Sequence, residues 1–196
     1  GDLRIIGNQS PRYRYGVNLS ARWNGIGLSV FLQGVGARDW YPGSDAGMFW
    51  GKYGRPFFAL IPSIHNYTDD MYSAERNNWD TAYWPRMTTY QSNGTKNWTR
   101  LLEIPNTRYI QSAAYLRVKN IQLDYSFPKH ICSAIRLQGL KIYVNAENLF
   151  TFTPLHKYAP NFDPEGLSYD SDFASAADGY TYPILKSVTV GVNITF

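Results

Sequence analysis

Hydrophobic and polar residues alternate with a period of two along five segments of this chain. The alternation is most regular in the last segment, which reads "VTVGVNITF" and ends on Phe196. A period of two places successive side chains on opposite faces of a β-strand. The pattern predicts an all-β, antiparallel fold with strands at residues 13–23, 28–40, 114–127, 137–149 and 184–196.

Two of these segments carry further information. The first places Arg14 and Arg22 on one face and only apolar or aromatic residues on the other. The third changes phase by one residue near Lys119 and Asn120, which predicts a β-bulge because a one-residue slip would otherwise exchange the two faces.

The length of the segments favours strands that cross a membrane. They span roughly 10 to 14 residues, whereas strands of soluble proteins have about 5 to 6 and tilted membrane strands about 9 to 11. Aromatic rings stand at both ends of the first segment, as they do at the two interfaces of a membrane barrel. The predicted lipid-facing residues of the last strand are Val188, Val190, Val192 and Ile194.

The connections between the segments are alternately short and long. The short ones contain "NGIG" and "PKHICSAIRLQG", and the long ones cover about 41–112 and 150–183. Bacterial barrels have short periplasmic turns and longer external loops. Five strands cannot close a barrel, since the smallest has about eight. The missing strands must therefore lie upstream of Gly1 or in partner chains. We favour the upstream position, in which this chain is the C-terminal portion of a longer protein and the remainder of the same barrel completes it.

Composition narrows the classes of protein that remain. Aromatic residues make up 16% of the chain and charged residues 17%, with a mean hydropathy of −0.37. No stretch approaches the roughly 18 apolar residues of a membrane helix. The net charge of +4 comes from scattered residues, so no nucleic-acid partner is expected. A soluble β-sandwich carbohydrate-binding module and a membrane barrel with a polar interior both fit.

Catalytic and cofactor chemistry find little support. His65, His130 and His156 are far apart in the sequence, and no hydrolase, metalloprotease or phosphate-loop motif occurs, so we expect no enzyme and no cofactor. The acidic stretch "YDSDFASAADG" fits no EF-hand spacing. It is interpreted as a solvated loop, and no metal site is predicted.

Several stretches resemble a known family. They are "SAAYLRVKNIQLDYSFPK", "LKIYVNAENLFTFT", "FDPEG", the terminal "VGVNITF" and the opening "IIGNQSPRYRYGVNLSARWNGIGLSVFLQGVGARDWYPG". In this order they resemble the C-terminal end of SusC/RagA-type TonB-dependent transporters of the Bacteroidetes. The resemblance implies a 22-stranded barrel whose strands cross the outer membrane of a Gram-negative cell many times. The N-terminal plug of such a barrel is absent from this chain.

The resemblance also implies partners and a mode of action. A SusD-like surface lipoprotein would act as a lid, TonB would supply energy through the missing N-terminal region, and the cargo would be a glycan or a peptide. By the same resemblance, Phe196 is a signal for the barrel-assembly machinery. A passive outer-membrane porin remains an alternative, because only upstream sequence could show the plug.

The first long loop contains the candidate substrate site. Flat rings stand there among amides, carboxylates and hydroxyls, a mixture that suits sugars or peptides. The alternative is that these rings only pack the loop against itself and the lid. The predicted substrate-binding residues are Trp79, Tyr83, Trp84, Tyr90 and Trp98.

Overall fold

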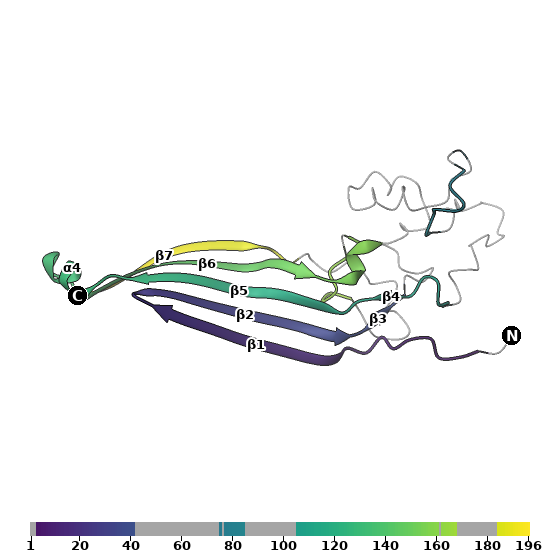
Figure 1. Ribbon diagram of the computed structural model, residues 1–196, viewed down its shortest axis with the longest axis horizontal. Helices are drawn as coiled ribbons and strands as arrows, with labels where there is room; N and C mark the ends of the chain where they lie inside the picture. The colour runs from purple at the N-terminus through teal and green to yellow at the C-terminus, as the bar shows by residue number, and fades with distance from the viewer. Residues whose placement is uncertain (1–2, 42–74, 76, 85–104, 161, 168–183) are drawn as a thin grey trace. The chain divides into compact units, whose positions relative to one another are not determined.

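The structure, a computed structural model, describes residues 3–41, 75, 77–84, 105–160, 162–167 and 184–196 (Figure 1). The chain divides into two units. The strand unit comprises Tyr13–Gly36, Tyr115–Phe152 and Ile184–Phe196, and the loop unit comprises Gly1–Arg12, Ala37–Ala114 and Thr153–Pro183. Among the residues described, no helix combines the length and the apolar character needed to cross a membrane.

The strand unit is one five-stranded sheet whose strands lie side by side in the order in which they follow one another in the chain, with β3 and β4 in a separate sheet (Figure 1). Its order is β1-β2-β5-β6-β7. The bounds are β1 Arg12–Trp23, β2 Ile26–Ala37, β5 Tyr115–Ser126, β6 Gly139–Phe152 and β7 Ser187–Thr195. Within the part of the chain described, the outer edges of β1 and β7 have no strand beside them. The sheet is therefore open at both sides.

The β1–β2 connection is a two-residue hairpin turn at Asn24 and Gly25. Both have positive φ, 47° for Asn24 and 87° for Gly25. Two such residues form a type I′ turn, whose twist matches that of the strands, and Asn-Gly is the pair that favours it. A side chain at Gly25 would also meet the carbonyl oxygen of Ser126 at 2.8 Å. The local sequence thus determines this turn.

The predicted β-bulge is confirmed at Lys119. Asn120 and Val118 of β5 each have a paired residue on both neighbouring strands, β2 and β6. Lys119, which stands between them, has no opposite residue on either strand. The extra residue restores the phase, and Val118 therefore lies on the same face as Ile121. On β6 the pairing skips residues between Glu147 and Phe150, where Asn148 has a φ of 53°. That second irregularity lets β6 continue to Phe152.

The segment 28–40 is divided in the structure. β2 ends at Ala37, and a separate short strand, β3 Asp39–Trp40, pairs with β4 Gln111–Ser112 in the loop unit. Arg38 stands between the two strands and is buried. Its guanidinium donates hydrogen bonds to the carbonyl oxygens of Gln9, Pro164 and Leu167. The pattern of residues 28–40 cannot show that the strand is divided at Arg38, because the division depends on three carbonyl groups that are distant from Arg38 in the chain.

The β5–β6 connection contains a short helix, α4 Lys129–Ala134. Pro128 precedes its first residue with an extended backbone conformation, and Ile135 follows its last. Cys132 is buried, and its thiol donates a hydrogen bond to the carbonyl oxygen of Phe127. The helix is thereby held against the end of β5.

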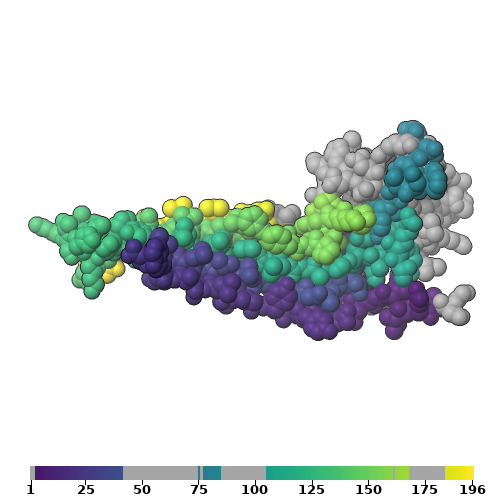
Figure 2. All heavy atoms as spheres, in the orientation of Figure 1, coloured from purple at the N-terminus to yellow at the C-terminus, as the bar shows by residue number. Residues whose placement is uncertain are grey.

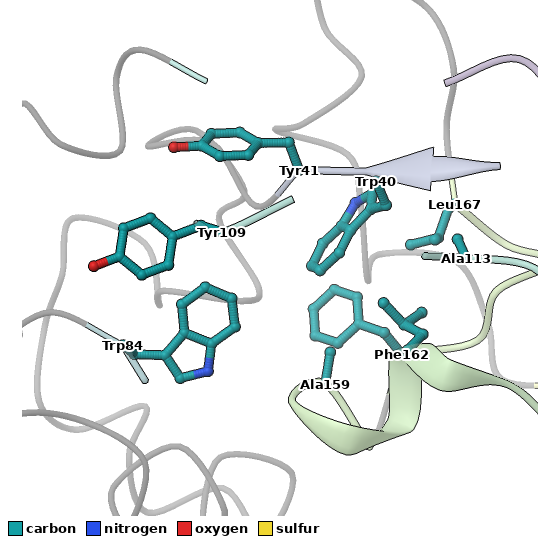
Figure 3. Packing of buried hydrophobic residues seen from close by; sticks show 9 residues of the cluster. Trp40, Tyr41, Trp84, Tyr109, Ala113, Ala159, Phe162 and Leu167 are labelled. Atoms are coloured by element: carbon teal, nitrogen blue, oxygen red, sulfur yellow. The ribbon is translucent and has the colours of Figure 1, made fainter. Parts of the chain in front are cut away.

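The loop unit has a small core of its own. It contains β3, β4 and a 3₁₀ helix, η4 Pro154–Lys157, which begins where the Thr153 hydroxyl accepts a hydrogen bond from the Leu155 backbone N–H. The buried residues that pack together are Trp40, Tyr41, Trp84, Tyr109, Ala113, Leu155, Ala159, Phe162 and Leu167 (Figure 3). In the described part of the loop unit, aromatic rings thus make up much of the core, and the regular elements there are β3, β4 and η4.

Candidate functional site

One face of the sheet is a continuous apolar surface assembled by the strand register. Leu28 of β2 lies opposite Leu123 of β5, which lies opposite Val144 of β6, which lies opposite Val190 of β7. The neighbouring row has the same character and consists of Val30, Ile121, Ala146 and Val188. Directly opposed residues lie on the same face of the sheet, so the apolar residues of neighbouring strands form continuous rows across it.

This apolar face is exposed to the surroundings. Val190 is 73% exposed, and Val188, Val192 and Ile194 are also exposed. Figure 2 shows one side of the sheet, on which β1, β2 and β5 can be followed along their length. Apolar patches of this extent mark a surface that contacts another apolar phase.

Aromatic rings border the apolar face at both ends. Tyr15, Phe150 and Phe152 stand at one end, with the Phe150 and Phe152 ring centroids 6.5 Å apart. At the end with the short connections, Tyr125 and Phe127 meet edge to face with their centroids 4.9 Å apart, and Trp23 is exposed. Two ring belts around an apolar band are the arrangement found in membrane barrels.

On the opposite face of the sheet, polar residues form rows in the same way. Ser29, Gln122, Asn145 and Thr189 form one of them. The adjacent row pairs large with small residues, because Tyr143 lies over Gly191, where any side chain would collide with the Tyr143 ring. These polar rows lie on the face opposite the apolar rows.

A buried carboxylate on the polar face links three strands, β1, β5 and β6, across the intervening strand β2. The carboxylate of Asp124 on β5 lies 3.3 Å from an Arg22 guanidinium nitrogen on β1 and 3.2 Å from Lys141 Nζ on β6. The Asp124 side chain is only 6% exposed, while that of Arg22 is 62% exposed. Arg22 reaches across β2 at Gly27, where any side chain would lie 2.6 Å from Asp124 Oδ1. The missing side chain of Gly27 thus makes room for the network.

In the loop unit, Trp79 is presented on a turn. The backbone N–H groups of Thr81 and Ala82 both donate to the carbonyl oxygen of Asn78, which closes the turn around Trp79. Trp79 is 72% exposed. An indole held outward on a closed turn is suited to stacking against a flat or apolar ligand surface.

Tyr83 and Trp84 follow this turn in the chain and pack against other aromatic rings. Trp84 is 1% exposed and stacks on Tyr109, with ring centroids 5.5 Å apart (Figure 3). Tyr83 stacks on Tyr158 at 3.7 Å and meets Trp84 edge to face at 4.7 Å. Of the predicted substrate-binding rings in the described part, Trp79 faces outward, Tyr83 is half-buried and Trp84 packs in the core.

Hydrogen bonds hold the Tyr83 ring in place. Its hydroxyl donates to the Arg108 carbonyl oxygen and accepts from the Gln111 side-chain amide. The Arg108 guanidinium in turn donates to the Ala82 carbonyl oxygen at 3.2 Å. Burial raises the pKa of Tyr83, an effect that the Gln111 hydrogen bond partly opposes. Tyr83 is thus a fixed element that connects the Trp79 turn with β4.

The loop unit should loosen in strong alkali. Burial, assisted by Tyr109 and Tyr83, raises the pKa of Tyr41 from 10.0 to about 12. The folded unit therefore favours the neutral phenol. The resulting stabilisation is fully present below about pH 10 and is lost as the pH rises through about 12. We expect near-ultraviolet circular dichroism to fall across that interval. Tyr41→Phe should retain its signal to higher pH, and coincident curves would contradict the assignment.

Several functional features escaped sequence reasoning. Trp40, Tyr109 and Phe162 complete the aromatic core of the loop unit, but they come from segments far apart in the chain. The Asp124 network depends on register across β1 to β6, which no single strand reveals. Tyr90, Trp98 and the acidic stretch with Asp170, Asp172 and Asp178 lie outside the described residues. Within the described part, no three acidic, histidine or cysteine side chains gather to hold a metal ion.

A single antiparallel sheet with one apolar and one polar face, bordered by ring belts, defines the wall of a membrane β-barrel. No family model matches the sequence. The chain is 25% identical over 201 residues to TonB-dependent receptor P3 of Formosa agariphila, and the match covers all of this chain and 17% of that protein. TonB-dependent receptor P39 of the same organism is 24% identical over 196 residues, again with 100% and 17% coverage.

Solved structures show the same fold. The chain matches the RagAB peptide transporter with a TM-score of 0.60 and 19% identity, covering 99% of this chain and 18% of that one. The match to the RagAB peptide importer in its "open-open" state has a TM-score of 0.59, 19% identity and coverages of 98% and 18%. The expected fold class, a segment of antiparallel barrel wall, and the resemblance to TonB-dependent transporters of the SusC/RagA type are confirmed. The chain spans 17% of the length of these two curated relatives, which are receptors rather than enzymes.

Proposed function

We propose that this chain forms five strands of the barrel of a TonB-dependent outer-membrane transporter that imports oligosaccharides or peptides. The observation that carries the proposal is the exposed apolar face, continuous across the strand rows and bordered by rings at both ends. It is supported by the similarity of the whole chain to TonB-dependent receptors.

The dimensions of the apolar face support a membrane position. From Tyr15 to Trp23, β1 advances eight residues, or roughly 26 Å at about 3.3 Å per residue. At the usual tilt of 35–45° this gives a band about 20 Å tall, close to the ~25 Å typical of outer-membrane barrels. In this proposal Val188, Val190, Val192 and Ile194 face lipid, and the Asp124 network faces the lumen.

Two alternatives are less well supported. A soluble β-sandwich would bury its apolar face against a second sheet, yet Val190 and its neighbours on β7 are exposed. A passive porin has the same wall but no energy coupling. Similarity to TonB-dependent receptors favours the energised transporter, with TonB acting through the part of the protein outside this chain.

We propose a surface lipoprotein of the SusD type as the partner at the external loops. The support is the likeness of fold to the RagAB peptide importer, together with the resemblance of the sequence to SusC/RagA-type transporters. The loop unit would contribute to the surface that meets this lid or the cargo.

Phe196 is proposed as the barrel-assembly signal. It follows β7 directly and is exposed, while the Thr195 carbonyl oxygen accepts a hydrogen bond from the Gln138 backbone N–H. The exposed Phe196 ring, beside this hydrogen bond, would be the group that the assembly machinery recognises.

Trp79 is the described residue best placed to contact cargo, and replacing it should weaken binding. Trp79→Ala should lower affinity about tenfold, or ~1.4 kcal/mol, because a stacking surface is removed. Stability should change little, since the side chain is 72% exposed. Calorimetric titration with defined oligosaccharide and oligopeptide pools would measure the effect and identify the cargo class. Trp79→Phe should retain most of the affinity, and unchanged binding by Trp79→Ala would refute the role.

The function is tested on the native polypeptide that carries this sequence. Cell membranes are fractionated, and the outer-membrane fraction is run on a gel with and without boiling. A closed barrel should be found in the outer membrane and should migrate differently after heating. A soluble, heat-indifferent band would overturn the proposal.

A further inference from the structure

The β5–β6 connection carries a basic and partly apolar helix at the end of the sheet where the chain also ends. Lys129, His130 and Arg136 are all exposed. The sequence from 128 to 138 contains no acidic residue. Two permanent positive charges therefore stand without a local counter-charge in the sequence of this connection.

Two isoleucines of the same connection face outward together. Ile131 is 40% exposed and Ile135, which follows the last residue of α4, is 54% exposed. Residues four apart lie on the same side of a helix. The buried Cys132 fixes the orientation of α4 through its hydrogen bond to the Phe127 carbonyl oxygen. The two exposed isoleucines thus belong to a connection whose buried side chain is Cys132.

α4 is continuous with the ring belt of the apolar face. Phe127, the residue that Cys132 contacts, meets Tyr125 of that belt edge to face. In Figure 1, α4 stands beyond the ends of the strands, beside the C-terminus. The Gln138 N–H donates to the Thr195 carbonyl oxygen, which places the connection beside the exposed Phe196.

We propose that α4 binds anionic phospholipid in the leaflet next to this end of the barrel. Ile131 and Ile135 enter the boundary between headgroups and acyl chains, while Lys129 and Arg136 contact lipid phosphates. Interfacial segments combine an apolar side with basic residues in this way. Two isoleucine side chains offer far less surface than a specific protein interface of about 800 Å² per partner requires. The inference rests on the proposed barrel and adds a lipid-binding role to its β5–β6 connection.

The test uses single-cysteine variants of the full-length transporter in nanodiscs, with Cys132 replaced by Ser. An environment-sensitive fluorophore is attached to Ile135→Cys, to Ser133→Cys or to Val190→Cys. The discs contain acyl-brominated phosphatidylcholine or acyl-brominated phosphatidylglycerol at the same mole fraction. Ser133 is the matched control, because residues two apart lie on nearly opposite sides of a helix. Val190 reports separately on the lipid-facing sheet.

Bromine should quench the labels at 135 and 190 strongly and the label at 133 weakly. Brominated phosphatidylglycerol should quench the 135 label several-fold more than brominated phosphatidylcholine. Adding Lys129→Gln and Arg136→Gln should remove that preference. If the 190 label is quenched but the 135 label resembles the 133 label, the inference fails and the barrel stands. If the 190 label is not quenched, both fail. A preference that survives the two Gln substitutions would overturn the anionic recognition.

Discussion

Val190→Arg should destabilise the folded barrel by about 2–4 kcal/mol, the range measured for a basic residue on a lipid face at mid-membrane. Val190 lies near the middle of β7 and is 73% exposed on the apolar face, opposite Val144. The loss arises because a guanidinium at that depth leaves water without gaining a partner. Urea titration of the heat-modifiable band in lipid vesicles measures it.

Two matched variants on the same strand distinguish contact with lipid from burial in a protein core. Thr189→Arg places the same side chain on the polar face, opposite Asn145, and should change stability by less than about 0.5 kcal/mol. Ile194→Arg lies on the apolar face near the strand end and should cost only about 0–1 kcal/mol, because the guanidinium can reach the headgroups. Equal losses at 190 and 194 would argue for the protein core.

Gly27→Ala should destabilise the sheet by about 1–3 kcal/mol, the usual range for overpacking. The new methyl group would lie 2.6 Å from Asp124 Oδ1 and 2.8 Å from Oδ2. The carboxylate must then move away from Arg22 and Lys141, which hold it at 3.3 Å and 3.2 Å. The same urea titration reports the change, with the electrophoretic shift on heating showing whether the barrel still closes.

A double-mutant cycle tests the cause. Asp124→Ala removes the group that the methyl would meet, so Gly27→Ala should cost much less in that background. Gly139→Ala is the control on β6, because its methyl group would lie an ordinary 3.6 Å from Thr195. If Gly27→Ala is as harmful without the Asp124 carboxylate as with it, the network does not explain the glycine.

The sheet could be anticipated because its signals are local. The period of two in the last strand, the Asn24-Gly25 turn and the phase change at Lys119 each depend on a few neighbouring residues. The division of the segment 28–40 at Arg38 could not, because the carbonyl groups that bind this guanidinium come from Gln9, Pro164 and Leu167.

The predicted substrate-binding residues show the same difference between local sequence signals and contacts between distant residues. The sequence identified a ring-rich loop, and Trp79, Tyr83 and Trp84 are neighbours in it. Nothing in their order indicates that Trp79 faces outward and Trp84 inward. That difference follows from packing, since Trp84 stacks on Tyr109 and Tyr83 on Tyr158, two rings from other parts of the chain.

The sequence by itself determined that this chain forms amphipathic antiparallel strands with a polar and an apolar face, because side-chain direction in a strand alternates with every residue. Only the tertiary structure decided which residues meet across the strands. Register places Asp124 between Arg22 and Lys141 and aligns Leu28 with Leu123, Val144 and Val190. Arg22 and Asp124 are 102 positions apart in the chain, and a local pattern contains no information about such pairs.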